Sequence, residues 1–265
     1  MVKARLRDGG TAAAEGFVSL VGAGPGAADL ITLRGVQRLQ EADVIFYDRL
    51  ASPELLELAR RDAERVSVGK TPGEAAWPQD RINGVIVAAA RQGKKVVRLK
   101  CGDPGVFARG AEEAEALDAA RIPWEIVPGV TAASAASAAM GRFLTERGET
   151  DAVLLTTGRT RAGDAPPDWA ANLRPGVAMA VYMGVANAPA LQADLLEAGV
   201  PFETPVDVAA AVGAPGETLL RSDLAGFVDA MRAAGVANPA IIIIRRSKRE
   251  AAANVRPFPV ALPAA

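Results

Sequence analysis

The sequence contains no histidine and a single cysteine, Cys101, among its 265 residues. Without histidine, the chain has neither the serine–histidine–aspartate arrangement of many hydrolases nor a histidine ligand for a metal ion. One cysteine excludes an internal disulfide and a structural zinc cluster built from cysteines. Proton transfer must therefore depend on aspartate, glutamate, lysine, tyrosine or water, and we expect no metal site.

Long hydrophobic runs and an excess of one charge are also missing. No segment reaches the roughly 18 apolar residues of a membrane-spanning helix, and the start of the chain lacks the apolar centre of a signal peptide. Lysine and arginine number 30, against 31 aspartate and glutamate residues. This balance gives no global field that would attract nucleic acid or an anionic membrane. An acidic ligand therefore needs a local cluster of basic side chains. Together with the single cysteine, the missing signal peptide and membrane helix lead us to expect a cytoplasmic protein.

Short β-branched runs alternate with alanine- and leucine-rich stretches over the first half of the chain. The alternation predicts strands at 17–21, 44–47, 64–68, 95–100 and 124–127, with helices between them. Such a series is typical of an open parallel sheet, which binds ligands at the carboxyl ends of its strands. Glycine or polar residues follow all of these strands, at 22–26, 48–49, 69–70, 100–103 and 128–131.

The second half predicts another α/β unit. Its expected strands are 153–157, 178–182, 207–212 and 240–244, and its expected helices are 187–198 and 224–234. Residues 162–168 are expected to form an exposed loop. The predicted organisation is a disordered tail at 1–15, domains at 16–140 and 141–249, and a loose tail at 250–265.

One short motif has several interpretations. Gly22, Gly24 and Ala27 fit the pattern G-x-G-x-x-A between a strand and a helix, and Asp48 follows the next strand. NAD-binding folds have these features, with the acidic residue on the ribose. The same glycines suit a plain tight turn, or a different adenosyl cofactor, because glycine lets backbone approach a ligand. On this motif alone, an NAD-dependent dehydrogenase stays open beside the other two interpretations.

A larger set of motifs favours the third interpretation, an adenosyl cofactor other than NAD. It comprises the segments 21–26, 30–33, 42–50, 68–70, 97–113, 127–132 and 182–184. In this order the set resembles the uroporphyrinogen-III C-methyltransferase family, within the wider tetrapyrrole methylase class, from about Phe17 to Arg245. The resemblance implies two α/β domains of the tetrapyrrole methylase type, with the active site in the cleft between them. It also implies an enzyme that moves methyl groups from S-adenosylmethionine to two ring positions of uroporphyrinogen III. The product would be precorrin-2, for sirohaem or cobalamin synthesis, and the enzyme would be a homodimer.

The resemblance further implies roles for individual residues. Asp48 would be the proton acceptor and Lys70 the proton donor. The S-adenosylmethionine pocket would use Pro25, Cys101, Gly102, Asp103, Val106, Thr131, Ala132, Met183, Gly213 and Ala240. Carboxylate arms of the tetrapyrrole need arginine, whose fork binds carboxylates through paired hydrogen bonds. The expected substrate contacts are Arg49, Arg109 and Arg147, with Glu112 on a pyrrole N–H.

Two alternatives remain within this resemblance: a methylase of another tetrapyrrole intermediate, and a degenerate methylase that binds ligand without turnover. Several residues depart from the family's motifs, among them Gly105, Ala108 and Ala111, and two departures bear on the expected site. Cys101 replaces a glycine of Gly-Gly-Asp-Pro, and Glu146 replaces the histidine of Thr-His-Arg, next to Arg147. Glu146 puts a carboxylate beside an arginine that is expected to meet a polyanion, which disfavours binding.

Overall fold

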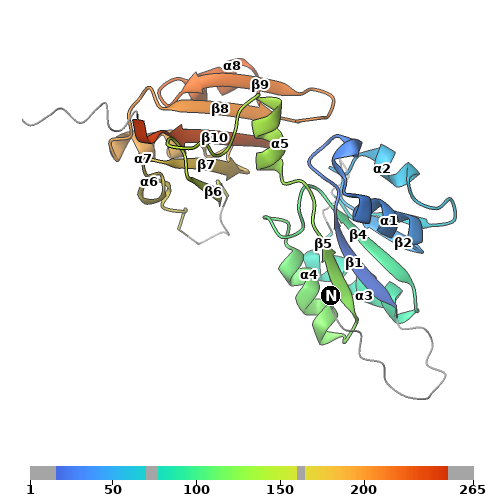
Figure 1. Cartoon of the computed structure of the whole chain (residues 1–265). Coiled ribbons are helices and arrows are strands. Elements are labelled where there is room, and N and C mark those ends of the chain that lie inside the picture. The colour runs from blue at the N-terminus through green and yellow to red at the C-terminus, as the bar shows by residue number, and fades with distance from the viewer. Residues whose placement is uncertain (1–15, 70–76, 160–164, 250–265) are drawn as a thin grey trace, which may run out of the picture. The chain divides into compact units, whose positions relative to one another are not determined.

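The computed structural model describes residues 16–69, 77–159 and 165–249 of the chain. They form two units that divide between Val130 and Thr131, and each unit contains a five-stranded sheet (Figure 1). The predicted tails at both ends, residues 162–164 of the predicted loop at 162–168, and Lys70 lie outside the described residues. Within the described ranges, no helix is long and apolar enough to span a bilayer.

The first unit is a parallel sheet with the strand order β3-β2-β4-β1-β5. Its strands are β1 (Phe17–Gly22), β2 (Val44–Tyr47), β3 (Glu64–Ser67), β4 (Lys95–Lys100) and β5 (Trp124–Val127). Its helices are the 3-10 turn η1 (Ala28–Leu30), α1 (Leu33–Glu41), α2 (Pro53–Glu57), α3 (Gln79–Arg91) and α4 (Gly110–Ala119). All neighbouring strands pair in parallel, which confirms the predicted parallel sheet.

Helices cover both faces of this sheet. On one face, Val21 and Leu99 pack in a cluster with Leu39 of α1 and Leu55 of α2. On the other face, strand residues such as Val96 pack with side chains of α3 and α4. Burial on both faces explains why the strands read as continuous apolar runs rather than as alternating ones.

The second unit is a mixed sheet with the order β6-β7-β10-β8-β9. Its strands are β6 (Ala152–Thr157), β7 (Val177–Tyr182), β8 (Pro205–Ala210), β9 (Thr218–Asp223) and β10 (Ala240–Arg246). Its helices are α5 (Ala132–Ala139), α6 (Trp169–Asn172), α7 (Ala188–Glu197) and α8 (Phe227–Ala233). Only β6 and β7 pair in parallel, while β10 runs antiparallel to both β7 and β8. The central strand β10 is therefore buried over its isoleucine run, Ile241–Ile244.

Three features of this unit differ from the sequence-based expectation. The edge strand β9 and the short helix α6 were not predicted; β9 alternates in exposure and owes its form to pairing with β8 along its whole length. The predicted domain boundary after residue 140 assigns α5 to the first domain. In the structure, α5 packs on β8 and β10, and Arg221 of β9 donates to the Met140 carbonyl oxygen at 2.6 Å. The alanine- and serine-rich sequence of α5 contains no feature that selects one sheet over the other.

The strand order also contradicts the interpretation as an NAD-dependent dehydrogenase. In the NAD-binding doubly wound sheet, β2 lies next to β1, so an acid after β2 stands beside the glycine-rich turn. Here β4 lies between β1 and β2 and pairs with both. In addition, the turn after Gly22 leads into η1, and α1 begins only at Leu33. The glycines therefore do not cap a helix that could bind a pyrophosphate, and the dehydrogenase interpretation is wrong.

Candidate functional site

The loops after β1, β4 and β5 meet at the carboxyl edge of the first sheet. The Gly102 N–H donates to the Gly24 carbonyl oxygen at 2.7 Å, and the Gly24 N–H donates back to Gly102 at 3.3 Å. A Cβ atom on Gly129 would lie 2.2 Å from the Gly102 carbonyl oxygen, and one on Gly22 would lie 2.6 Å from the Gly129 backbone. Only glycine permits such close packing of three loops, so the motif glycines build this edge.

Asp103 fastens two of these loops to each other. Its Oδ1 accepts from the Gly105 N–H at 2.7 Å, and its Oδ2 accepts from the Gly129 N–H at 2.9 Å. The carboxylate is thus occupied by main-chain donors of the loops after β4 and β5. Any contact of Asp103 with a cofactor would come from its backbone, as the resemblance implies.

Asp48 stands at the same edge, directly after β2, with 32% of its side chain exposed. Arg98 of β4, only 3% exposed, donates from Nη2 to Asp48 Oδ1 at 2.5 Å. Burial alone would lower the pKa of Arg98, but the Asp48 and Glu113 carboxylates outweigh burial and raise it. A permanently charged group therefore holds one oxygen of Asp48, while part of the carboxylate stays accessible. The arrangement suits a carboxylate that accepts a proton from a ligand.

Glu113, in the first turn of α4, is joined to Asp48 through Arg98 and was not among the predicted site residues. It is 1% exposed and binds Lys100 Nζ through both carboxylate oxygens, each at 2.8 Å. Burial, and next the nearby Arg98, lower the pKa of Lys100. A sequence signal existed, because Arg98 and Lys100 alternate with the apolar residues Val97 and Leu99 in a predicted strand. Such charges need partners from elsewhere in the fold.

Cys101 directly follows Lys100, and its thiol lies close enough to the Asp48 carboxylate to feel its charge. Burial, and next the Asp48 carboxylate, raise the pKa of Cys101 to about 11. The thiol is therefore protonated near neutral pH and is not a nucleophile.

The predicted substrate contacts of the first unit lie near this edge. Arg109 begins the turn into α4, and its guanidinium binds both oxygens of Glu112, with Nε at 2.7 Å. Both side chains are about half exposed, so an acidic substrate could replace Glu112 as the partner of Arg109. Arg49, next to Asp48, is exposed.

The predicted cofactor residues of the second unit also gather at one edge of their sheet. Met183 follows β7, and Ala240 begins β10 opposite the last residue of β8. Gly213 lies three residues beyond the end of β8. The Tyr182 hydroxyl hydrogen-bonds to the Thr131 side chain at 2.6 Å and accepts from the Ala133 N–H at 3.0 Å. These bonds hold the start of α5, with Thr131 and Ala132, at this edge.

Unusual backbone geometry marks both edges. Among the described residues, the non-glycine residues with positive φ are Phe107, Arg109, Arg121, Met183 and Ala211. Phe107 and Arg109 lie in the loop after β4, and Met183 and Ala211 directly follow β7 and β8. Such conformations cost on the order of 1–3 kcal/mol each and concentrate at functional sites. This feature supports the two edges independently of the sequence motifs.

Arg147 is the exception among the second unit's candidates. It is exposed within the turn between Glu146 and Thr150, whose backbones exchange hydrogen bonds. Asp151, which follows Thr150, donates its N–H to the carbonyl oxygen of Gly176, and Gly176 directly precedes β7. The turn therefore lies where β6 and β7 begin, whereas Met183 lies where β7 ends. A strand of this length spans about 20 Å, so the structure does not bring Arg147 to the edge that holds Met183.

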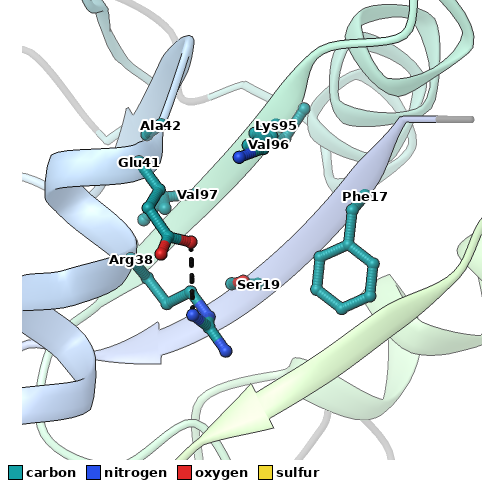
Figure 2. A pocket seen from close by; sticks show the side chains of 8 residues that line it. All are labelled: Phe17, Ser19, Arg38, Glu41, Ala42, Lys95, Val96 and Val97. Carbon is teal, nitrogen blue, oxygen red and sulfur yellow. Dashed lines mark hydrogen bonds and ion pairs between the residues drawn. The ribbon is translucent and has the colours of Figure 1, made fainter. Parts of the chain in front are cut away.

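A cavity of about 240 Å³ lies at the opposite, amino-terminal edge of the first sheet (Figure 2). Phe17 and Lys95, which begin β1 and β4, line it together with Arg38 and Glu41 of α1. Figure 2 shows Arg38 and Glu41 joined by their ion pair. None of the predicted site residues within the described ranges lines this cavity, and open α/β sheets bind ligands at the other edge.

Comparison with known families gives one match over most of the chain. Residues 18–227 match the family model described as tetrapyrrole (corrin/porphyrin) methylases. Among curated proteins, the siroheme synthase of Sodalis glossinidius is 50% identical over 193 residues, which cover 73% of this chain and 41% of that protein. The siroheme synthase of Chromobacterium violaceum is 45% identical over 91% of this chain and 51% of its own length. The chain thus spans about half the length of the curated relatives it matches.

Solved structures agree with this match. The cobalamin biosynthetic enzyme CbiF, a cobalt precorrin-4 methyltransferase, is similar with a TM-score of 0.76 and 31% identity, over 86% of this chain and 94% of that one. The uroporphyrin-III C-methyltransferase of Thermus thermophilus, complexed with S-adenosylhomocysteine, has a TM-score of 0.72 and 34% identity, over 86% and 91% of the two chains.

Proposed function

Because this chain belongs to the family of tetrapyrrole (corrin/porphyrin) methylases, we propose that it methylates uroporphyrinogen III at two ring positions with S-adenosylmethionine. The product is precorrin-2, which feeds sirohaem or cobalamin synthesis. The observation that carries the proposal is Asp48, an accessible carboxylate held by the buried Arg98 at the edge built by the glycine loops. The relatives named siroheme synthase and uroporphyrin-III C-methyltransferase support this choice of substrate.

The residues at the two edges suit an adenosyl cofactor. Most are small, so the backbone can come close to a bound ligand. We assign cofactor binding to Pro25, Cys101, Gly102, Asp103, Val106, Thr131, Ala132, Met183, Gly213 and Ala240. When bound, S-adenosylmethionine supplies a methyl group on a positively charged sulfur, which a nucleophilic ring carbon takes without further activation.

The protein's own residues then position the substrate and remove a proton. Asp48 accepts the proton that the ring loses once the new carbon–carbon bond has formed. Arg49 and Arg109 bind carboxylate arms of the tetrapyrrole, and Glu112, released from Arg109, accepts a pyrrole N–H. We also propose that Lys70 is the proton donor, as the resemblance implies.

A second candidate is a methylase of another tetrapyrrole intermediate. The similarity to CbiF favours it, since that TM-score exceeds the one for the uroporphyrin-III enzyme. The sequence identity has the opposite order, with 34% for the uroporphyrin-III enzyme against 31% for CbiF. Because the curated relatives at 45–50% identity are siroheme synthases, we place uroporphyrinogen III first.

Mass spectrometry of the product tests the proposal. The purified chain is incubated with S-adenosylmethionine and uroporphyrinogen III, and we expect a product heavier by two CH2 units, because each added methyl group replaces a proton. Methylation of a later precorrin, with none of uroporphyrinogen III, would support the second candidate. Binding of S-adenosylhomocysteine without any methylated product would identify a degenerate methylase.

We also propose that the enzyme is a cytoplasmic homodimer without a nucleic-acid or membrane partner. The near balance of 30 basic and 31 acidic residues supports the last point. Light scattering of the purified protein tests the dimer, and a mass equal to one chain at micromolar concentration would contradict it.

A further inference from the structure

A buried ionic network lies behind Asp48 in the first unit. Its members are Arg98 and Lys100, two residues apart on β4, and Glu113 in the first turn of α4. Their side chains are 3%, 2% and 1% exposed, respectively. With Asp48, the network holds two positive and two negative groups, so its formal charges cancel.

Arg98 connects Glu113 to Asp48. Its Nε donates to Glu113 Oε1 at 3.0 Å, its Nη2 donates to Asp48 Oδ1 at 2.5 Å, and its Nη1 donates to the Leu99 carbonyl oxygen at 3.0 Å. All three nitrogens of the planar group therefore have an acceptor. Because each of the three nitrogens donates a hydrogen bond, the guanidinium cannot rotate without losing one of them. The acceptor at Nε therefore helps to fix the direction in which Nη2 points.

Glu113 is itself fixed from two further sides. Lys100 binds both of its oxygens at 2.8 Å, and Gln79 of α3 donates to Oε1 at 3.4 Å. The carboxylate thus stands between β4 and α3, and its position does not depend on Arg98 alone. Buried ion pairs contribute little net stability because desolvation offsets their attraction, so stability gives a weak reason for this network.

We propose that Glu113 is a positioning residue, which acts through Arg98 to hold the Asp48 carboxylate in the orientation that accepts the substrate's proton. The inference rests on the proposed function, which makes Asp48 the proton acceptor. Charged or titratable groups reach Asp48 from β4 as Arg98 and Lys100, from the loop after β4 as Cys101, and from α4 as Glu113 through Arg98. Among the described residues, Glu113 is the helix residue that Arg98 connects to Asp48.

Two double variants, equal in charge, separate positioning from charge balance. Lys100→Met with Glu113→Leu removes one cation and one anion and leaves Arg98 Nε without its acceptor. Lys100→Met with Glu113→Gln makes the same charge change, but the amide oxygen can still accept from Nε. We expect kcat to fall about 10- to 100-fold in the leucine variant and to recover most of that loss in the glutamine variant. The KM for uroporphyrinogen III and the affinity for S-adenosylhomocysteine should match the wild type in both.

Equal kcat in the two double variants would overturn the proposal, because charge and packing alone would then account for the network. If the leucine variant does not fold, Lys100→Met with Glu113→Gln decides by comparison with the wild type. It keeps both the acceptor for Arg98 Nε and the charge balance, so we expect kcat within about threefold of the wild type, and a loss of about 100-fold would contradict positioning. Glu125→Gln is the matched control, because Glu125 binds Arg38 at the other edge of the same sheet. It should lower the melting temperature without lowering kcat.

Failure of the proposed function would be visible separately, as a wild type that does not methylate uroporphyrinogen III. Crystal structures of the two double variants then test the inference directly. We expect the contact between Arg98 Nη2 and Asp48 Oδ1 to persist in the glutamine variant and to be lost in the leucine variant. An unchanged contact in both would overturn it.

Discussion

Two aspartates flank β2 and have different partners. Asp43, before the strand, accepts from the Lys95 N–H at 2.8 Å and from Arg60 at 2.9 Å. The Lys95 hydrogen bond holds the pKa of Asp43 below its ordinary value, in spite of partial burial. Asp48, after the strand, accepts a hydrogen bond from the buried Arg98 and keeps 32% of its side chain exposed. Asp43 therefore fastens two strands, whereas Asp48 is available for chemistry.

Asp48→Asn should lower kcat roughly 100-fold or more, because the amide cannot accept the proton that the ring loses. The affinity for S-adenosylhomocysteine should stay unchanged, since it does not depend on proton transfer. Steady-state kinetics and calorimetry measure the two quantities. Asp43→Asn is the control and should cost stability but not kcat. Unchanged turnover in Asp48→Asn would mean that water or another residue is the base.

The predicted substrate arginines differ in position. Arg109 lies near the edge that carries Asp48, whereas Arg147 lies away from the edge of its own sheet that carries Met183. We expect Arg109→Ala to raise the KM for uroporphyrinogen III about tenfold or more, since a carboxylate arm loses a charged partner. Arg147→Ala should raise KM less. The reverse order would return Arg147 to the substrate site and would make its neighbour Glu146 a candidate determinant of specificity.

At the scale of elements, the close contact between the loops after β4 and β5 can be tested by adding a single methyl group. A Cβ atom on Gly129 would lie 2.2 Å from the Gly102 oxygen, so Gly129→Ala must push the loops after β4 and β5 apart. We expect a loss of about 1–3 kcal/mol in the free energy of unfolding, and weaker binding of S-adenosylhomocysteine. Denaturant unfolding and calorimetry measure these effects.

Gly84 in α3 offers the matched control, because nothing lies within 4 Å of a Cβ atom there. Gly84→Ala should raise the free energy of unfolding by roughly 0.5–1 kcal/mol, as alanine favours a helix interior. If Gly129→Ala were as well tolerated as Gly84→Ala, the loops would be more adaptable than their packing indicates.

Arg38 of α1 joins Glu125 of β5, which also accepts from Ser19 of β1 at 3.0 Å. Burial alone would raise the pKa of Glu125, but these hydrogen bonds outweigh burial and lower it from 4.5. A lowered carboxyl pKa contributes stability above the unfolded-state value and loses it as the pH falls through the folded-state value. Glu125→Gln should therefore cost about 1 kcal/mol at neutral pH. The difference from the wild type should shrink below pH 4.5. A pH-independent difference in urea unfolding would contradict this assignment.

Helix α1 shows the limit of a periodic pattern. Leu30, Leu33, Val36 and Leu39 predict one apolar stripe, yet Leu33 is 84% exposed and Leu39 is fully buried. The helix begins at Leu33, after Thr32 accepts the Gly35 N–H as its cap. Leu33 therefore stands in the first turn, where the stripe has not yet reached the core.

For the whole molecule, ligand-dependent stability is the simplest measurement. S-adenosylhomocysteine should raise the melting temperature, because a ligand that binds only the folded state stabilises it, by about 2.7 kcal/mol at 100 times its dissociation constant. NAD should leave the melting temperature unchanged, since the strand order separates Asp48 from the glycine turn. Differential scanning fluorimetry compares the two ligands. A shift with NAD alone would contradict the proposed cofactor.

Local patterns in the sequence determined the succession of strands and helices, the parallel first sheet and the position of Asp48 at a strand end. They could do so because apolar runs and glycine turns are encoded by neighbouring residues. The motif set likewise led to the methylase family. Only the tertiary structure placed α5 on the second sheet, moved Arg147 away from the edge that carries Met183, and joined Glu113 to Asp48 through Arg98. These relations depend on which strands pair and in what order, and residues distant in sequence fix that order through packing and burial.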